Sequence, residues 1–173
     1  YHSYGNGSGM RVSAAGFMAK SIEECIDLAT KTALPTHDHP EGIKGAVATA
    51  LAIFYGMQGK DKDFIRKQVL DEYYPNWSAL TYESIKPGYG FDETCQQTIP
   101  AALICFLESK NYEDCLKLAI ALGGDADTLA AISGPMAYAF YKTMPEELIA
   151  NAKAKLPDWM LQVNEELDQF VNQ

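Results

Sequence analysis

The residues best suited to chemistry lie together in the run Gly123–Thr128, which reads Gly-Gly-Asp-Ala-Asp-Thr. Its two carboxylates, Asp125 and Asp127, stand two residues apart at the expected start of a helix, and the hydroxyl of Thr128 follows. All three side chains offer oxygen, which a hard cation such as Mg²⁺ prefers. The alternative is structural, because an Asp also caps a helix and favours its positive end.

A second candidate is the glycine-rich segment Gly5-Asn6-Gly7-Ser8-Gly9, which Met10 and Arg11 follow. Glycines let backbone N–H groups approach a phosphate closely, and Arg11 either adds positive charge there or pairs with an internal acid. No Gly-Lys-Ser/Thr follows, so the segment is not a nucleotide-binding P-loop. The alternative is a flexible surface loop.

Two histidines, His37 and His39, flank Asp38 just before Pro40. Histidines at this spacing bind a transition metal only with further ligands, and no Cys or third His stands nearby. We therefore expect His37 to contact a ligand by hydrogen bonding. The alternative is that this segment only starts a helix, with Asp38 as its cap.

Aromatic side chains gather in a third segment, at Tyr89 and Phe91, on either side of Gly90. Aromatic rings on a loop stack on a base or ribose, and they equally well cover a hydrophobic core. The sequence alone does not separate these two roles.

These candidates must be positioned by helices, because apolar residues recur at helical spacing along most of the chain and no convincing alternating strand is present. The sequence predicts a single all-α domain over residues 1–173, with about seven to nine helices around a central apolar one. Helix-start signals stand at Ser21 with Glu24, at Pro40, at Pro100, and at Asn111 with Asp114.

The stretch Thr128–Tyr141 is apolar nearly all round and rich in small residues, so we expect it to be the most buried helix. In contrast, residues 1–16 hold four glycines and three serines, and residues 75–98 show no sustained period and are dominated by Tyr, Pro, Gly and Trp, so both segments are predicted to be loops. Polar helices after Pro145 and Pro157 are expected at outer positions.

The charge balance of the chain disfavours some classes of binding partner. Lys and Arg number 14 against 23 Asp and Glu, and this acidic balance disfavours direct nucleic-acid binding and membrane-surface binding. No apolar run is long enough to span a bilayer. The cysteines show no Cys-x-x-Cys pair and are expected to be reduced and buried, which favours a cytoplasmic location. They are Cys25, Cys95, Cys105 and Cys115.

Taken in order, these motifs resemble the ADP-ribosylglycohydrolase family, which includes the dinitrogenase-reductase-activating glycohydrolases. That family shows a Gly-Asn-Gly-Ala-x-Met-Arg loop, a Thr-His pair before a helix, a Pro-Ala-rich helix and a Gly-Gly-Asp-x-Asp-Thr segment. The matching residues are Gly5–Arg11 with Ser8-Gly9 as a mild departure, Thr36-His37, Pro100–Ala102 and Gly123–Thr128. The resemblance covers nearly the whole chain.

The resemblance implies an orthogonal all-α bundle that hydrolyses the glycosidic bond of ADP-ribose with the help of two Mg²⁺ or Mn²⁺ ions. Asp125, Asp127 and Thr128 match metal ligands of the family. The diphosphate of ADP-ribose would lie against Gly5, Asn6, Gly7, Ser8 and Gly9, with His37 as a further contact and Tyr89 or Phe91 near the adenosine.

Family members also carry, ahead of this part, a helix with a catalytic acid and a Thr-Asp-Asp-Thr segment that completes the metal site. The chain shows neither, so we expect it to correspond to the C-terminal two-thirds of a member, lacking the N-terminal helices. No catalytic residue is assigned. A complementing N-terminal segment or a homo-oligomer would then cover apolar surface. Three functions stay open: an ADP-ribosyl hydrolase, an ADP-ribose-binding module or pseudoenzyme, and a structural protein.

Overall fold

The computed structural model describes residues 1–171, and in that part of the chain it contains helices and one isolated bridge, between Gly5 and Thr94, but no strand. The all-α prediction is confirmed. The α-helices are α1 (Gly7–Met10), α2 (Ser13–Met18), α3 (Ile22–Ala33), α4 (Pro40–Met57), α5 (Lys62–Ile65), α6 (Tyr82–Ile85), α7 (Cys95–Glu108), α8 (Tyr112–Leu122), α9 (Ala126–Tyr141), α10 (Glu146–Lys153) and α11 (Asp158–Val171). A π-helix η1 (Arg66–Asp71) and two 3-10 turns, η2 (Pro75–Trp77) and η3 (Lys86–Gly88), complete the set.

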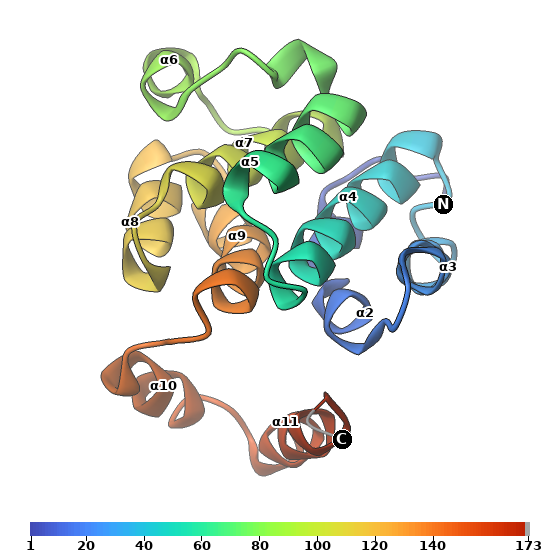
Figure 1. Ribbon diagram of the computed structural model, residues 1–173, viewed down its shortest axis with the longest axis vertical. Helices are drawn as coiled ribbons and strands as arrows, with labels where there is room; N and C mark the ends of the chain where they lie inside the picture. Colours follow the sequence, from blue (N-terminus) through green and yellow to red (C-terminus); the bar gives the residue numbers. More distant parts are fainter. Residues whose placement is uncertain (172–173) are drawn as a thin grey trace.

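The core lies where α4, α7 and α9 meet, with α3 packed on α4 and α8 packed on α9 (Figure 1). Residues 45–56 of α4 and 98–107 of α7 are buried without interruption. Both runs are apolar and rich in Ala, so the helices approach one another closely on several sides. The segments that carry the candidate residues belong to these three helices or pack against them.

Helix α9 is not the most buried helix, contrary to the expectation for Thr128–Tyr141. One side of α9 faces solvent, where Ala131 is exposed and Tyr138 is 42% exposed. Its alanines and glycine give the sequence an apolar character all round, but small side chains tolerate exposure at little cost. The uninterrupted burial belongs instead to α4 and α7.

Both predicted loops contain helices, so these two predictions were wrong. The N-terminal one holds α1 and α2, because the small residues there pack against α4 rather than forming a mobile segment. The second holds η2, α6, η3 and the first turn of α7. Helix α7 begins at Cys95, so Pro100 lies inside the helix instead of opening it, and removes one backbone donor there. These short elements bring the number of α-helices in the described residues above the predicted range.

Three predicted helix starts are confirmed, since Ser21 and Asn111 cap α3 and α8, and Pro40 is the first residue of α4. Ser21 Oγ accepts a hydrogen bond from the Glu24 N–H at 3.1 Å, and Asn111 Oδ1 accepts one from the Asp114 N–H at 2.8 Å. At the start of α4, however, the cap is His39, whose Nδ1 accepts from the Glu41 N–H at 3.1 Å. Asp38 contacts His2 instead, at 3.2 Å.

The predicted burial of the cysteines is confirmed, since all four are buried and free. A search of the described helices finds none that combines the length and the apolar character needed to cross a membrane.

Helices α10 and α11 form an arm below the bundle (Figure 1), and neither contains a buried residue. The arm meets the body mainly where α11 contacts α2. Four apolar side chains of α11 remain exposed on one broad face of the helix. They are Trp159, Met160, Val163 and Phe170.

We expect this face to drive self-association, because contiguous apolar surface on a helix is removed from water when it pairs. Static light scattering of the wild type should show a mass that rises with concentration, and replacing Trp159 and Val163 by Glu should return it to the monomer mass. A matched double change on the polar face, Gln162→Glu with Gln169→Glu, should leave the association intact. A wild type that stays monomeric at every concentration would contradict this expectation.

Candidate active site

The acidic motif sits at a sharp turn between two helices. Helix α8 ends at Leu122, and Gly123 and Gly124 both have positive φ, +85° and +64°. A Cβ atom on Gly124 would lie 2.6 Å from the carbonyl oxygen of Gly90 and 3.0 Å from Tyr89 Cε1. Only glycine fits this turn, and the close approach sets the aromatic segment directly beside the start of α9.

Asp125 precedes α9 at the N-cap position, yet its side chain makes no capping hydrogen bond. Its Oδ2 instead accepts a hydrogen bond from Asn6 Nδ2 at 2.7 Å. Asp127 is exposed in the first turn, and Thr128 is buried with its hydroxyl 3.7 Å from Met10 Sδ. The capping alternative therefore does not explain Asp125, and three oxygen-bearing side chains surround one helix start.

The glycine-rich segment runs beside the residues that precede α7. The backbone N–H of Asn6 donates to the Glu93 carbonyl at 2.7 Å, and the N–H of Cys95 donates to the Tyr4 carbonyl at 2.9 Å. The Asn6 amide also donates to Thr98 Oγ1 at 3.1 Å. The glycine-rich, aromatic and acidic motifs are thus joined at one place, as the ordered resemblance implied.

Thr98 was missed by sequence reasoning. It fell at the end of a predicted loop, and a single Thr between Gln97 and Ile99 carries no signal of its own. In the structure it is fully buried, and its hydroxyl donates to the Asp92 carbonyl at 3.1 Å. It joins Asn6 to the aromatic segment.

Two residues of the glycine-rich segment face inward. The Ser8 hydroxyl donates to the Gly42 carbonyl at 2.7 Å, so that side chain serves packing. Gly9 lies tightly against the Ile99 side chain. Any ligand contact from Ser8 and Gly9 must then come from the backbone, and Gly5 and Gly7 remain the more open part of the segment.

His37 lies against this open part, since the position of a Cβ on Gly7 is 3.1 Å from His37 Nε2. The Thr36 hydroxyl accepts from Arg11 Nη2 at 2.7 Å and stands 2.7 Å from His37 Nδ1. The Thr36 hydroxyl donates to Nδ1 in one His37 tautomer and accepts from it in the other, and in both Nε2 is the ring nitrogen that faces Gly7. Burial, and then the charge of Arg11, lower the pKa of His37. Arg11 itself serves the end of α3 by donating to the Thr32 carbonyl at 2.9 Å.

His39 does not share a site with His37. Its ring caps α4 and packs edge-on against His2 and Tyr4. Within residues 1–171 there is no group of three or more His, Cys, Asp or Glu side chains close enough to hold a metal.

The two aromatic candidates differ in burial. Tyr89 is partly buried against Gly124, and burial, followed by Cys105, Asp92 and Asp125, raises the pKa of Tyr89 well above its usual range. Phe91 is 71% exposed. Tyr89 therefore packs against the turn before α9, whereas the ring of Phe91 is open to solvent.

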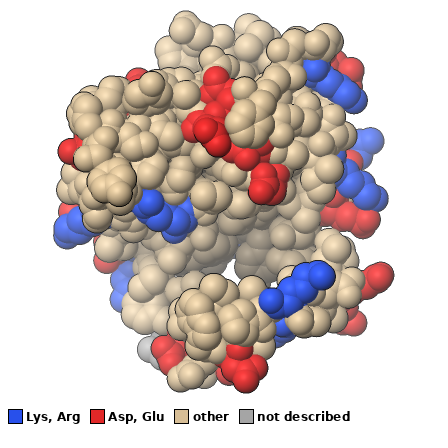
Figure 2. All heavy atoms as spheres, turned by 180° about the vertical axis from the view of Figure 1, so that it is seen from behind, with Lys and Arg blue, Asp and Glu red and all other residues tan. Residues whose placement is uncertain are grey.

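Charge on the molecule is uneven. Figure 2 shows Asp and Glu side chains gathered into one patch on the face turned away in Figure 1, with no Lys or Arg inside it. Such a concentration of negative charge attracts divalent cations over several ångströms.

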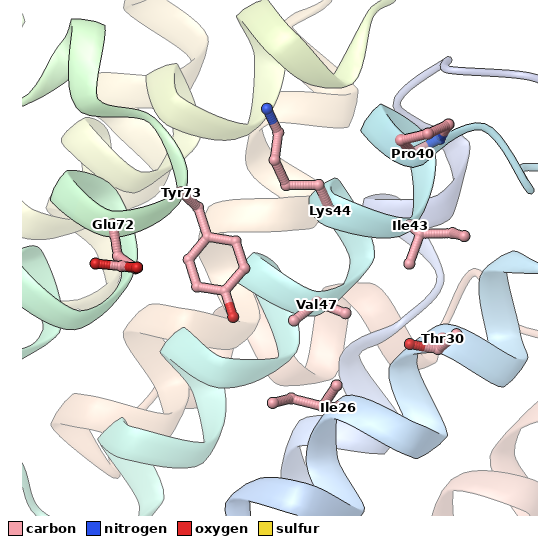
Figure 3. Close-up of a pocket in the computed structure, with 8 residues that line it drawn as sticks. All are labelled: Ile26, Thr30, Pro40, Ile43, Lys44, Val47, Glu72 and Tyr73. Atoms are coloured by element: carbon pink, nitrogen blue, oxygen red, sulfur yellow. The ribbon is translucent and has the colours of Figure 1, made fainter.

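One groove of the structure is a separate feature. It has a volume of about 660 Å³, lies between α3, α4 and the turn that follows η1, and is lined by none of the predicted site residues (Figure 3). Its one lysine, Lys44, is already engaged by Glu41 at 2.5 Å and by the Tyr74 ring at 4.9 Å. The lining residues are Ile26, Thr30, Pro40, Ile43, Lys44, Val47, Glu72 and Tyr73.

Comparison with known proteins decides the family. The family model described as ADP-ribosylglycohydrolase matches residues 1–172. The chain belongs to the ADP-ribosylglycohydrolase family. The resemblance inferred from the four motifs is thereby confirmed.

Similar members of the ADP-ribosylglycohydrolase family come from distant organisms. ADP-ribosylhydrolase ARH3 of Homo sapiens is 27% identical over 183 residues, which cover 80% of this chain and 50% of that protein. An uncharacterized protein of Archaeoglobus fulgidus is 27% identical, covering 85% of this chain and 53% of its own length. The chain thus spans about half the length of the curated relatives it matches.

A solved structure, titled ADP-ribosylglycohydrolase-related protein complex, shares the fold. It superimposes with a TM-score of 0.71 at 23% identity, and the match covers 97% of this chain and 58% of that one.

The residues present fit a hard cation in kind. Asp125 uses one oxygen for Asn6, which leaves Oδ1 for an ion, and Asp127 lies exposed beside it. The Thr128 hydroxyl has only the weak sulfur contact. Carboxylate and hydroxyl oxygens suit Mg²⁺ or Mn²⁺, and an ion with so few protein ligands keeps several waters.

The close packing of the turn at Gly124 can be tested by mutation. Gly124→Ala should lower the free energy of unfolding by more than about 1 kcal/mol, since Ala disfavours positive φ and its Cβ meets the Gly90 carbonyl. Gly88→Ala is the matched control, because nothing lies within 4 Å of its Cβ position, and it should be neutral or slightly stabilising. Urea unfolding measures both, and equal stability of the two variants would count against the tight turn.

The lowered pKa of His37 predicts a pH dependence. The unfolded chain takes up the proton near the ordinary value of 6.5, above the folded pKa, so stability present at neutral pH is lost as the pH falls through the folded pKa. His37→Gln should flatten this part of the stability profile between pH 7.5 and 5, whereas His2→Gln at an exposed position should not. Urea midpoints at several pH values would show it, and an unchanged slope in His37→Gln would refute the assignment.

Proposed function

We propose that this chain is the part of an ADP-ribosyl hydrolase that binds the diphosphate and one cation, in an enzyme that removes ADP-ribose from a modified protein or a small molecule. The observation that carries the proposal is the contact between Asn6 and Asp125. It joins a segment suited to phosphate with a carboxylate pair suited to a cation. The printed name of the human relative, an ADP-ribosylhydrolase, supports this reaction class.

Asp125, Asp127 and Thr128 would hold Mg²⁺ or Mn²⁺, which when bound supplies Lewis-acid polarisation and orients oxygen ligands. The backbone N–H of Gly7 would bind a diphosphate oxygen, because those of Gly5 and Asn6 already donate to Ser3 Oγ and to the Glu93 carbonyl. In the tautomer with its proton on Nε2, His37 would donate to the same anion. Each of these contacts orients the substrate, and orientation alone is worth roughly 7–11 kcal/mol in well-placed reactions.

Aromatic stacking would fix the other end of the ligand. Phe91 is exposed, so its ring would be available to an adenine, and Tyr89 lies against the Gly124 turn. Stacking of this kind fits the position that the family resemblance gives to the adenosine.

Two acids beside the matching motifs are already engaged within the protein. Asp92 is engaged through Oδ1 by the Thr94 N–H at 2.7 Å and the Thr94 hydroxyl at 2.5 Å, and Asp38 contacts His2. We infer that the catalytic acid and the remaining metal ligands belong to the part of its relatives that this chain does not span. A second candidate function follows from the same observation, namely ADP-ribose binding without turnover, because only two carboxylates stand at the start of α9.

The proposal predicts binding without turnover by the 173-residue chain. With Mn²⁺, calorimetry should show weak cation binding that Asp127→Asn removes, while Asp27→Asn, which only loosens the surface pair with Lys31, should leave it unchanged. Equal binding by wild type and Asp127→Asn would remove the basis for the cation site.

Turnover is expected once the missing part is supplied. Joined to the N-terminal segment typical of the family, the chain should release ADP-ribose from ADP-ribosylated arginine or serine substrates, and Asp127→Asn should reduce that rate by about 100-fold or more. Robust turnover by the 173-residue chain alone, abolished by Asp127→Asn, would show that it forms a complete site by itself. A joined protein that binds Mn²⁺ and ADP-ribose but never turns over would favour the binding function.

A further inference from the structure

Asn6 belongs to the segment expected to contact a ligand, but its side chain points into the protein. Asn6 is 7% exposed, and its amide nitrogen lies 2.7 Å from Asp125 Oδ2 and 3.1 Å from Thr98 Oγ1. A side-chain amide has two N–H donors. Both are used within the protein, so none remains for a phosphate.

The direction of these hydrogen bonds is fixed by their neighbours. Thr98 is fully buried and donates its only proton to the Asp92 carbonyl, so it must accept from Asn6. The carboxylate of Asp125 is an acceptor as well. The nitrogen of the Asn6 amide, and not its oxygen, therefore faces both partners.

Asp125 has a competing conformation close at hand. It stands at the N-cap of α9, where an Asp side chain ordinarily turns back to accept from the N–H two or three residues on. It makes no such bond here, and the hydrogen bond to Asn6 is the contact that holds it away from the helix. A charge-assisted bond of 2.7 Å is strong enough to decide between two rotamers.

We propose that Asn6 is a positioning residue of the cation site: it holds Asp125 by Oδ2, keeps Oδ1 free for the ion, and is itself oriented by Thr98. The inference rests on the proposed function for the identity of the cation site. It reassigns Asn6 from a substrate contact to a support for a metal ligand. It also makes Thr98, which no motif marks, part of the same support.

Removing Asn6 should let Asp125 turn and cap α9. Stability then falls only by the lost hydrogen bond to Thr98, because the new capping bond replaces the one to Asp125, while cation affinity falls as well. Loss of an outer-shell partner of a metal ligand typically weakens binding 10- to 100-fold. A residue needed only for folding would show the opposite result, with stability lost and affinity retained.

The experiment measures Mn²⁺ affinity by electron paramagnetic resonance and calorimetry on the full chain, beside urea unfolding. Asn6→Ala should weaken Mn²⁺ about 10-fold or more. Thr98→Val should weaken it in the same direction but less, and Thr98→Ser, which keeps the hydroxyl, should stay near wild type. Asn111→Ala is the matched control, since it removes the cap of α8 and should lower stability without changing Mn²⁺ affinity.

A second readout needs no metal. In Asn6→Ala the backbone amides of Asp127 and Thr128 should shift in the nuclear magnetic resonance spectrum and exchange more slowly, because the Asp125 carboxylate now accepts from one of them. Unchanged amides together with unchanged Mn²⁺ affinity would overturn the proposal. Should Asn6→Ala fail to fold, Thr98→Val decides by the same two measurements.

The two readouts separate this inference from the proposed function. If Asp127→Asn leaves Mn²⁺ binding unchanged, or wild type binds no Mn²⁺, the cation site is wrong, and the amide shifts alone then decide whether Asn6 holds Asp125. If Asp127→Asn abolishes binding and Asn6→Ala does not weaken it, the cation site stands and the role of Asn6 is refuted.

Discussion

The candidate site depends on one hydrogen bond, which joins the glycine-rich segment to the acidic motif. It links Asn6 to Asp125, which are 119 positions apart in the chain. Bringing such distant segments together carries an entropic cost that grows only slowly with length, but the bond forms only where both backbones are already held. Helices α4, α7 and α9 provide that rigidity. The site can therefore form only if the core is folded, whereas the site itself contributes little to the stability of the core.

Helix α7 contributes both to the core and to the site. Its buried apolar face, which includes Ile99, presses on Gly9, and its Thr98 hydroxyl lies one residue away within the polar network. Neighbouring residues of one helical turn thus fix the glycine-rich segment by packing and by hydrogen bonding. A slip of the segment along α7 would break both kinds of contact at once, which keeps its register unique.

Prediction from the sequence succeeded where a residue type has one usual structural role within its own segment. Ser21 and Asn111 cap helices because a short oxygen-bearing side chain reaches a free N–H, and this needs no tertiary information. The grouping of the motifs also followed from their order. Reasoning failed where packing overrides local signals. The N-terminal glycines form helices against α4, and His39, rather than Asp38, caps α4.

The directions of side chains were beyond reach from the sequence. Ser8 and Asn6 lie in a segment that the sequence predicts to face a ligand, yet both side chains point inward. Ser8 donates to Gly42, which is 34 residues away, and Asn6 donates to Thr98, which is 92 residues away. The exposure of α9 was misjudged for a related reason. Alanine is compatible with a core and with a surface, so an Ala-rich helix does not reveal which of its sides is covered.

The contacts of His37 have a consequence for selectivity. The Thr36 hydroxyl occupies Nδ1, so only Nε2 is turned to the glycine-rich segment. In the tautomer with the proton on Nε2 the neutral ring can only donate there, and in the other tautomer it can only accept. The proton between Thr36 and His37 therefore sets whether this ring favours an anion or a cation on the glycine-rich segment.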